Sequence, residues 1–225
     1  MAFHEITALP GCAEQKQIND RLADAHVMMR LPLGDLEAGC NYSVVDLLLA
    51  VVSGVSTRLY PSSLTGKGEL FKNLLIDHYP WANEPAGGPQ PNVAADILWK
   101  QYRNPLTHAL GMEPGGGYSD VKVIKNPRTE AELEAIELNP AWPTEWDKPT
   151  LFQTASGIEL RVKCLYWGVR RMIESVAPVA RPTGARPNVA AVSATASTVV
   201  TTVSSAAETP LMMSKPSPML KKGEA

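Results

Sequence analysis

The sequence predicts a mainly α-helical protein of about five helices, with a small two-stranded β insertion before the last helix and a disordered C-terminal tail. Apolar residues recur at helical spacing in several segments, and one short stretch alternates apolar and charged residues as a strand does. From about Pro178 the composition changes to Ala, Ser, Thr, Val and Pro, which cannot bury enough apolar surface to offset the entropy of ordering. We therefore expect a helical domain over residues 13–177 and a low-complexity tail over residues 178–225.

The first two helices are expected over residues 13–30 and 43–60. In the first, apolar residues recur every three or four positions along one side. The second is the most apolar; it has Ser43 as its N-cap and ends at Tyr60, which precedes a proline. Because its apolar residues run nearly all round, we expect this helix to be the central and most buried one.

Two further helices are expected over residues 67–79 and 92–110. The former places large apolar residues on one face and ends before Pro80. The latter begins with apolar residues at helical spacing and ends near Gly111.

The β insertion is expected within residues 118–154. Residues 118–124 alternate apolar and charged side chains, and we expect them to pair with residues 151–154 as a small hairpin-like flap. Between these strands, residues 129–138 have a helical pattern. The last helix is then expected over residues 157–176.

Composition narrows the class of protein. The chain has 225 residues, of which 44% are hydrophobic and 20% charged, as in an ordinary globular protein. No apolar run has the length of a membrane span, and the N-terminus lacks the basic-then-apolar layout of a signal peptide. We therefore expect no membrane partner. Cys12, Cys40 and Cys164 are widely spaced and odd in number, which predicts a reduced, cytoplasmic compartment.

The charge distribution argues against a domain that coats nucleic acid. The formal net charge is −2, and the tail holds more basic than acidic residues, so residues 1–177 are more acidic still. Any nucleic-acid contact must therefore be local. We expect no cofactor and no metal site, because no set of His, Cys and acidic residues has ligand spacing. His4 and His26 are expected at the surface.

One motif concentrates chemical groups at the end of a predicted helix. Arg103, Asn104 and His108 bring together a guanidinium, an amide and an imidazole. A planar, permanently charged guanidinium holds phosphate oxygens through paired hydrogen bonds, and imidazole transfers protons near neutral pH. These are the groups required to hold a phosphodiester and move protons around it without a metal.

The Arg-Asn-x3-His motif resembles the signature of the HEPN superfamily (higher eukaryote and prokaryote nucleotide-binding domains). That signature is an Arg, usually followed by Asn, His or Asp, then a His after four to six residues; here four intervene. The resemblance covers the helical part, residues 13–177. It implies an all-helical bundle that forms a homodimer with facing motifs, and often a metal-independent endoribonuclease acting on RNA in defence or stress.

The resemblance and the chemistry together suggest a role for each residue. Arg103 would stabilise the charge on the phosphate, His108 would transfer protons, and Asn104 would orient His108 or the phosphate. Arg103 and His108 are five positions apart, about 140° round an ideal helix, so a straight helix does not bring them together. Either a kink at Pro105 or a second chain in a two-fold dimer would do so.

The sequence departs from one branch of the family. HEPN toxins that are silenced by a nucleotidyltransferase antitoxin carry a Tyr shortly after the His, and here residues 109–111 are Ala-Leu-Gly. This argues against that toxin–antitoxin mechanism and leaves any antitoxin partner unknown.

Other polar residues are candidates for supporting roles. Asp46 and Ser53 lie seven positions apart on one face of the apolar helix 43–60. They either line a cleft beside Arg103, or bond internally or face water at a helix crossing. Basic residues near the insertion and on the last helix either form a rim that contacts RNA or lie on a solvated helix face. These are Lys122, Lys125, Arg170 and Arg171.

The sequence therefore leaves three functions open. The first is a metal-independent endoribonuclease centred on Arg103 and His108. The second is a catalytically inactive HEPN-like module for binding or dimerisation. The third is a helical scaffold in which the motif is fortuitous.

Overall fold

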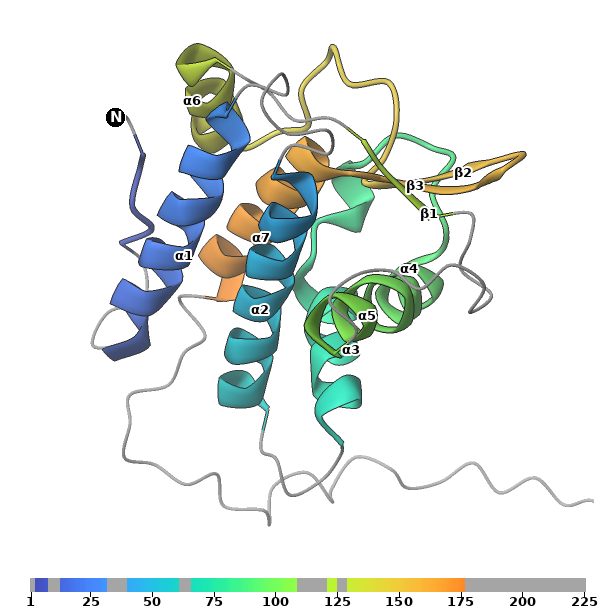
Figure 1. Cartoon of the computed structure of the whole chain (residues 1–225), viewed down its shortest axis with the longest axis horizontal. Coiled ribbons are helices and arrows are strands. Elements are labelled where there is room, and N and C mark those ends of the chain that lie inside the picture. The colour runs from blue at the N-terminus through green and yellow to red at the C-terminus, as the bar shows by residue number, and fades with distance from the viewer. Residues whose placement is uncertain are drawn as a thin grey trace, which may run out of the picture. The chain divides into compact units, whose positions relative to one another are not determined.

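Two long helices form one side of the domain in the computed structural model, which describes residues 3–7, 13–31, 40–60, 66–108, 121–124 and 129–176. They are α1 (Ala13–Arg30) and α2 (Asn41–Leu59), and they lie side by side (Figure 1). Both predicted helices are confirmed, although α2 begins two residues before Ser43, with Cys40 at the N-cap position. The predicted tail, residues 178–225, lies outside the described residues.

The most buried helix is α7 (Val162–Val176) and not α2, so the expected ranking of the two helices is wrong. α7 packs against α2, α3, α6 and strand β3, and only scattered positions along it remain accessible. α2 buries the face that contains Val44, Leu48 and Val52, while Ser43, Gly54 and Thr57 are exposed. Apolar residues that remain accessible on α2 include Tyr42, Leu47 and Ala50, so the apolar composition of this helix did not indicate how deeply it is buried.

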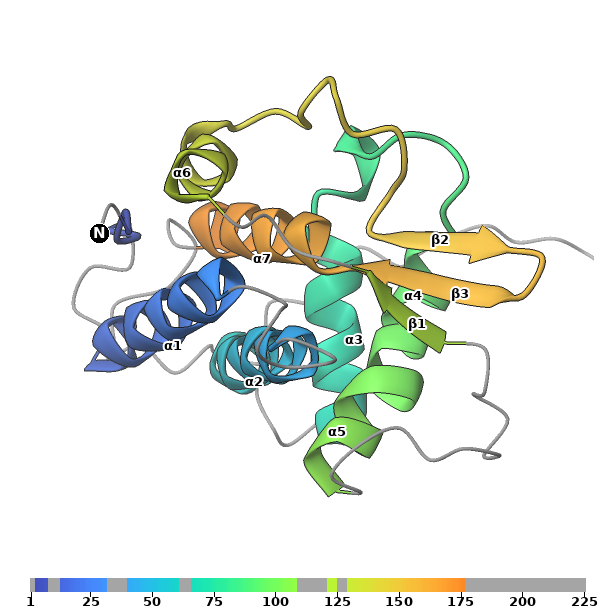
Figure 2. The ribbon, with the colours of Figure 1, turned by 45° about the horizontal axis from the view of Figure 1, so that its top comes forward.

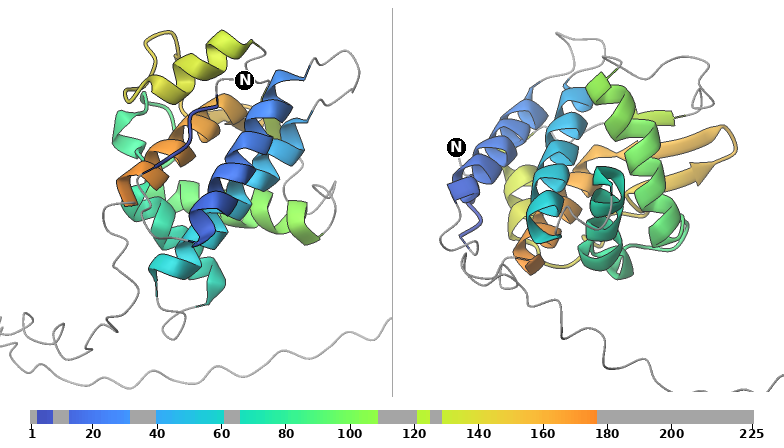
Figure 3. Two further views of the ribbon diagram at one scale, coloured as in Figure 1. Left: turned by 90° about the vertical axis from the view of Figure 1, so that its left-hand side faces the viewer. Right: turned by 90° about the horizontal axis from the view of Figure 1, so that it is seen from below.

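The next helix, α3 (Lys67–His78), ends before Tyr79 and Pro80 as predicted. Its buried residues are Leu70, Phe71, Leu74 and Leu75. Seen from below, α2 lies between α1 on one side and α3 with the following helical segment on the other (Figure 3).

The predicted helix 92–110 is one helical segment with an irregular centre. It consists of α4 (Pro91–Ile97), a π-helical stretch η3 (Leu98–Arg103) and α5 (Asn104–His108). The N–H of Asn104 bonds to the carbonyl of Trp99, five residues back. Pro105 has no N–H, and its ring would clash with the carbonyl four residues earlier in a regular helix. The irregularity thus lies before the proline, and the helix continues through it.

A three-stranded sheet replaces the predicted two-stranded flap. Its strands are β1 (Val121–Ile124), β2 (Leu151–Thr154) and β3 (Gly157–Arg161), in the order β1-β3-β2. β1 runs parallel to β3, β2 runs antiparallel to it, and β3 leads directly into α7 (Figure 2).

Strand β3 was predicted as part of the last helix, and that prediction is wrong. Residues 151–154 were expected to pair with β1, but Leu151 lies opposite Leu160 of β3. The turn between β2 and β3 ends at Gly157 with a φ of 137°, a conformation that favours glycine. That turn signal separates β3 from α7, which therefore begins at Val162.

The remaining helix, α6 (Glu130–Leu138), lies within the predicted range 129–138. Thr129 and Glu132 cap its N-terminus reciprocally: each side chain binds the other's backbone N–H.

Among the described helices, α2 alone has the length and apolar composition of a membrane span. Of its apolar window, 44% is buried inside the protein. The core helices of globular proteins have the same properties, so this observation is weak evidence for a membrane.

Candidate functional site

Arg103 lies at the end of η3 and is held between two helices. Its Nε donates a hydrogen bond to Oγ of Ser53 on α2, at 3.4 Å. Its guanidinium carbon lies 5.1 Å from the centre of the Trp99 ring, within the range of a cation–π contact. The side chain is half-buried, so the surrounding residues restrict its orientation while part of it remains accessible.

Trp99 is in turn positioned by α3. Its ring centre lies 5.1 Å from that of Phe71, and its edge packs on Gly68. A Cβ atom on Gly68 would lie only 2.8 Å from Cε2 of Trp99, so this close approach requires glycine. Gly68, Trp99, Arg103 and Ser53 therefore form a stacked series that runs from α3 to α2.

The opposite face of η3 anchors the segment in the core. Leu98 and Tyr102 are fully buried there. Burial raises the pKa of the Tyr102 phenol, so it remains neutral in the physiological range. The core therefore fixes the rotation of η3 and keeps Trp99 and Arg103 on its outer side.

The other two motif residues follow in α5. Asn104 is half-buried and is the first residue of that helix. His108 is its last residue, and the His108 side chain lies outside the part of the chain that the structure describes. The predicted cooperation of Arg103 with His108, within one chain or across a dimer, thus stays a prediction.

The structure brings one of the two supporting residues to Arg103. Ser53 binds its guanidinium directly. Asp46, seven residues earlier, lines a hollow between α1 and α2 together with Asp24 and Ser43. Ser53 thus contacts Arg103, and Asp46 lines the hollow beside α1.

The predicted basic rim on the last helix is wrong for both arginines. Arg170 is only 2% exposed, and its Nη2 donates to the backbone carbonyl of His4 at 2.6 Å. Arg171 donates to the carbonyls of Ile136 and Glu137 at the end of α6. Each guanidinium binds backbone acceptors of another segment, so Arg170 is buried and Arg171 is only partly exposed.

The predicted rim also included two lysines, Lys122 and Lys125. The side chain of Lys122 and the whole of Lys125 lie outside the described residues.

A buried polar cluster, which was not predicted from the sequence, joins the N-terminal segment to α1, α6 and α7. His26, expected at the surface, is fully buried, with Nδ1 2.8 Å from Oε1 of Glu137. The Tyr166 hydroxyl donates to the same carboxylate oxygen at 2.5 Å. Arg170 lies 3.6 Å from it, and Nε2 of His26 is 3.2 Å from Glu130. These five residues are called the His26–Glu137 cluster.

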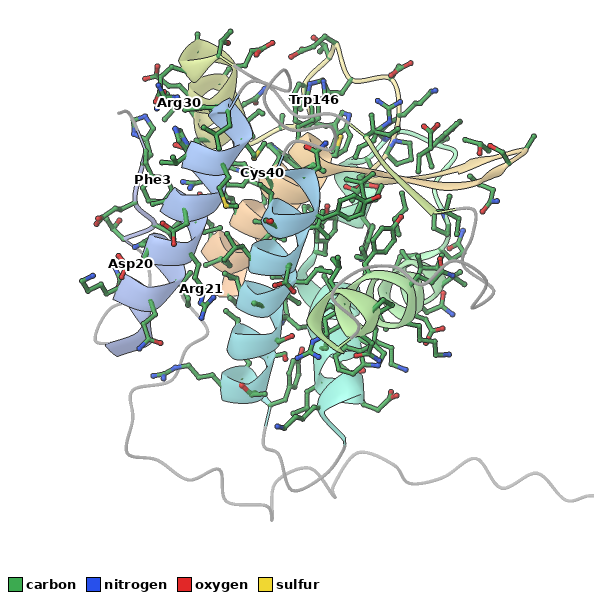
Figure 4. The ribbon with its side chains drawn as sticks, viewed as in Figure 1. Phe3, Asp20, Arg21, Arg30, Cys40 and Trp146 are labelled. Atoms are coloured by element: carbon green, nitrogen blue, oxygen red, sulfur yellow. The ribbon has the colours of Figure 1, made fainter. Side chains whose placement is uncertain are left out.

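Hydrogen bonding sets the charge state of this cluster. Burial lowers the pKa of His26, but its bonds to Glu137 and Glu130 outweigh this and raise the pKa above the usual value. Burial raises the pKa of Glu137, but its hydrogen bonds from His26 and Tyr166 outweigh burial, so the pKa of Glu137 lies below its usual value. Arg30 pairs with Glu130 at the rim of the cluster (Figure 4). The cluster is an internal connection between distant segments.

A second acid, the half-buried Glu84, joins the segment after α3 to the start of the sheet. Its carboxylate accepts hydrogen bonds from the backbone N–H of Thr150 at 3.2 Å and from the Thr150 hydroxyl at 2.5 Å. The Thr150 hydroxyl also lies 2.6 Å from that of Tyr79. Burial raises the pKa of Glu84 to about 7, although the bonds from Thr150 oppose the shift.

The described residues contain no group of three or more His, Cys, Asp or Glu arranged to hold a metal ion. No family model, curated protein or solved structure matches the chain.

Proposed function

We propose that this protein is a metal-independent endoribonuclease in which Arg103 binds the scissile phosphate. The observation that carries the proposal is the restraint of Arg103 by Ser53 and Trp99 at a half-buried position. A guanidinium that is already oriented does not have to be ordered when charge develops on the phosphate. Asn104 and His108 follow directly in the same helical segment.

The π-helical stretch adds support for this location. Such stretches are rare and occur frequently at functional sites. Here the stretch ends at Arg103 itself. The π-helical stretch therefore lies at the motif.

The chemistry is a transesterification. The 2′-hydroxyl oxygen of RNA bonds to the neighbouring phosphorus, and the bond from phosphorus to the 5′-oxygen breaks. One proton leaves the 2′-hydroxyl and one is delivered to the 5′-oxygen, a role for which His108 is the suited group. Arg103 would bind the non-bridging oxygens, whose charge increases in the transition state. Asn104 would orient the phosphate or the imidazole.

The resemblance to HEPN proteins extends this proposal to a homodimer acting on RNA in the cytoplasm, in defence or stress. The absence of the Tyr after His108 leaves open whether an antitoxin controls it.

The second candidate function is a catalytically inactive module for binding or dimerisation. The same contacts of Arg103 favour it, because a guanidinium packed on Trp99 and bound to Ser53 also joins η3 to α2. In that case Arg103 would contribute to stability and not to catalysis.

The test is cleavage of total RNA by purified protein in EDTA. The variants are Arg103→Ala and His108→Ala, with Lys100→Ala as the control. Lys100 lies on the same π-helical stretch and pairs with Asp96 at 2.9 Å, so its loss removes a nearby cation but leaves the motif intact. We expect chelator-resistant cleavage, with 2′,3′-cyclic phosphate ends, by the wild type and by Lys100→Ala only.

Two outcomes would reject the endoribonuclease. Equal cleavage by all four proteins would indicate a contaminant or another site. No cleavage by the wild type, together with a lower melting temperature of Arg103→Ala than of Lys100→Ala, would support the binding module.

A further inference from the structure

A pocket of about 310 Å³ lies between the first half of α1 and the second half of α2. Its volume is at the lower end of the range for small-molecule sites, which is about 300–1,000 Å³. Positions three or four apart share one face of a helix, and the lining residues follow this spacing on both helices. They include Ile18 and Arg21 of α1 and Val51, Gly54, Val55 and Arg58 of α2. This space is called the Arg21–Arg58 pocket.

The floor of the pocket is apolar and belongs to the core. Val51 and Val55 are only 3% and 5% exposed, and both are part of the hydrophobic core. Ile18 is half-buried and packs against that core from α1. An aliphatic group that enters the pocket would therefore contact an apolar surface that is already in place.

The rim of the pocket is basic. Arg21 and Arg58 are the charged residues that line it, and both are exposed. They come from different helices, and the side chain of Arg21 lies between α1 and α2 in Figure 4. Guanidinium groups bind carboxylate and phosphate oxygens through paired hydrogen bonds. Basic groups at the rim of an apolar floor are complementary to an anion that has an aliphatic body.

Gly54 keeps the pocket open. A glycine inside a helix destabilises that helix relative to alanine. Gly68 and Gly168 have a packing reason, because a Cβ atom at either position would lie within 3 Å of an aromatic side chain. A Cβ atom at Gly54 would have no described atom within 4 Å apart from its neighbours in the helix. Close packing does not require this glycine, and its effect is to leave space between the two helices.

The composition of the lining also selects the class of anion. Of the described residues that line the pocket, none is aromatic and none is acidic. A nucleobase would find no ring there on which to stack. An anion would meet no carboxylate of the lining that repels it. An aliphatic chain with an anionic head group fits this lining better than a nucleotide does.

We propose that the Arg21–Arg58 pocket binds a small anion with an aliphatic body, either a medium-chain carboxylate or the phosphate monoester of a medium-chain alcohol. Arg21 and Arg58 bind the anionic head group, and the aliphatic chain lies on Ile18, Val51 and Val55. The proposal is independent of the ribonuclease activity, since it uses neither the Arg-Asn-x3-His motif nor the residues that hold it.

The first test measures binding to the full chain by isothermal titration calorimetry. The probes are octanoate, octyl phosphate, octylammonium and butyrate. Octanoate or octyl phosphate should bind with one site per chain, and the tighter of the two identifies the head group. Octylammonium has the same chain with the opposite charge and should bind at least about tenfold more weakly. Butyrate should also bind about tenfold more weakly than octanoate or less, because four fewer methylene groups leave water.

Two results of this titration would overturn the proposal. If neither octanoate nor octyl phosphate binds, the pocket does not accept this class of anion. If octylammonium binds as tightly as both anions, or butyrate as tightly as octanoate, the head group or the chain makes no contact of the proposed kind.

The second test removes the basic groups one at a time. Arg21→Gln and Arg58→Gln should each raise the dissociation constant of the tighter anion by about threefold to tenfold, because a charged hydrogen-bond donor is lost. Lys16→Gln is the matched control. Lys16 is exposed on α1 and pairs with Asp20 at 2.7 Å, so its loss removes the same charge outside the pocket. Equal weakening by all three substitutions would indicate attraction to net charge and would contradict a site at the two arginines.

The third test fills the pocket and leaves its charge unchanged. Gly54→Leu introduces a branched side chain into the open space, and Gly54→Ala adds a single methyl group at the same position. Gly54→Leu should raise the dissociation constant at least about tenfold, and Gly54→Ala by less than about threefold. Both replace a glycine inside a helix, so far-UV circular dichroism should show that both are folded. A folded Gly54→Leu protein that binds the anion as tightly as Gly54→Ala would place the anion elsewhere and overturn the proposal.

Discussion

The guanidinium of Arg103 lies 5.1 Å from the ring centre of Trp99, and this contact links the candidate site to the core. Trp99 itself rests on α3 through Phe71 and Gly68. The orientation of Arg103 therefore depends on residues that were not part of the motif. This dependence leads to the first prediction.

Gly68→Ala should destabilise the protein by about 1–3 kcal/mol, because the new methyl group overlaps the Trp99 ring and forces it to move. The measurement is the free energy of unfolding in urea, together with the emission spectrum of tryptophan. Gly54→Ala is the control: it also lies within a helix, but its Cβ position is open, so it should stabilise by up to about 1 kcal/mol. Equal effects of the two substitutions would show that Trp99 is not packed on Gly68.

Gly168→Ala should be more damaging, with a loss of about 3 kcal/mol or more. A Cβ atom there would overlap the ring of Tyr79, whose buried hydroxyl is 2.6 Å from that of Thr150. The free energy of unfolding in urea measures this loss. Tyr79→Phe removes only the hydroxyl and should cost about 1–2 kcal/mol. A Gly168→Ala protein as stable as the Tyr79→Phe protein would refute the close packing of α7 on Tyr79.

The buried histidine should make stability depend on pH. Because the folded state raises the pKa of His26, its contribution is complete below the unfolded pKa and is lost as pH rises through the folded value. The stability advantage of the wild type over His26→Gln should thus be larger at pH 6 than at pH 9. Urea unfolding of both proteins at the two values measures this difference. A constant or growing advantage toward pH 9 would contradict it.

Glu84 should give a separate pH effect. Its pKa is raised from 4.5 to about 7, so the folded state favours the protonated acid, and stability is lost as pH rises from about 4.5 through about 7. The shift corresponds to about 3 kcal/mol as an order of magnitude. Glu84→Gln is uncharged and should lack this loss. Parallel stability curves for wild type and Glu84→Gln between pH 4.5 and 8 would argue against the shift.

Helical periodicity predicted the helices because it is a local property. The ranges 13–30, 67–79 and 129–138 correspond closely to α1, α3 and α6. The pattern failed where partners in space decide the structure. Ile158 lies four positions before Val162 and so fits the spacing of the following helix, yet it pairs with β1 and β2. The parallel pairing of β1 with β3 joins residues far apart in the sequence, which no local pattern records.

The sequence predicted those parts of the candidate site that have a local pattern, and it missed those that depend on contacts between distant segments. The motif identified Arg103, and the polar face of α2 suggested Ser53, which binds it. No sequence pattern indicated the contact between Trp99 and Gly68, because the two residues are far apart in the sequence and meet only in the folded protein. Arg170 and His26 were placed at the surface because polar residues usually lie there. Their partners, Glu137 and the carbonyl of His4, come from other segments.

The central claim is that Arg103 acts through its guanidinium on a phosphate, and Arg103→Lys tests it most directly. Lysine keeps the charge but loses the planar fork that makes two parallel hydrogen bonds. The measurement is the single-turnover rate of RNA cleavage in EDTA, compared with that of Lys100→Ala. We predict a fall of at least about a hundredfold for Arg103→Lys and wild-type cleavage for the control. Equal rates for the two variants would contradict the proposed role of Arg103.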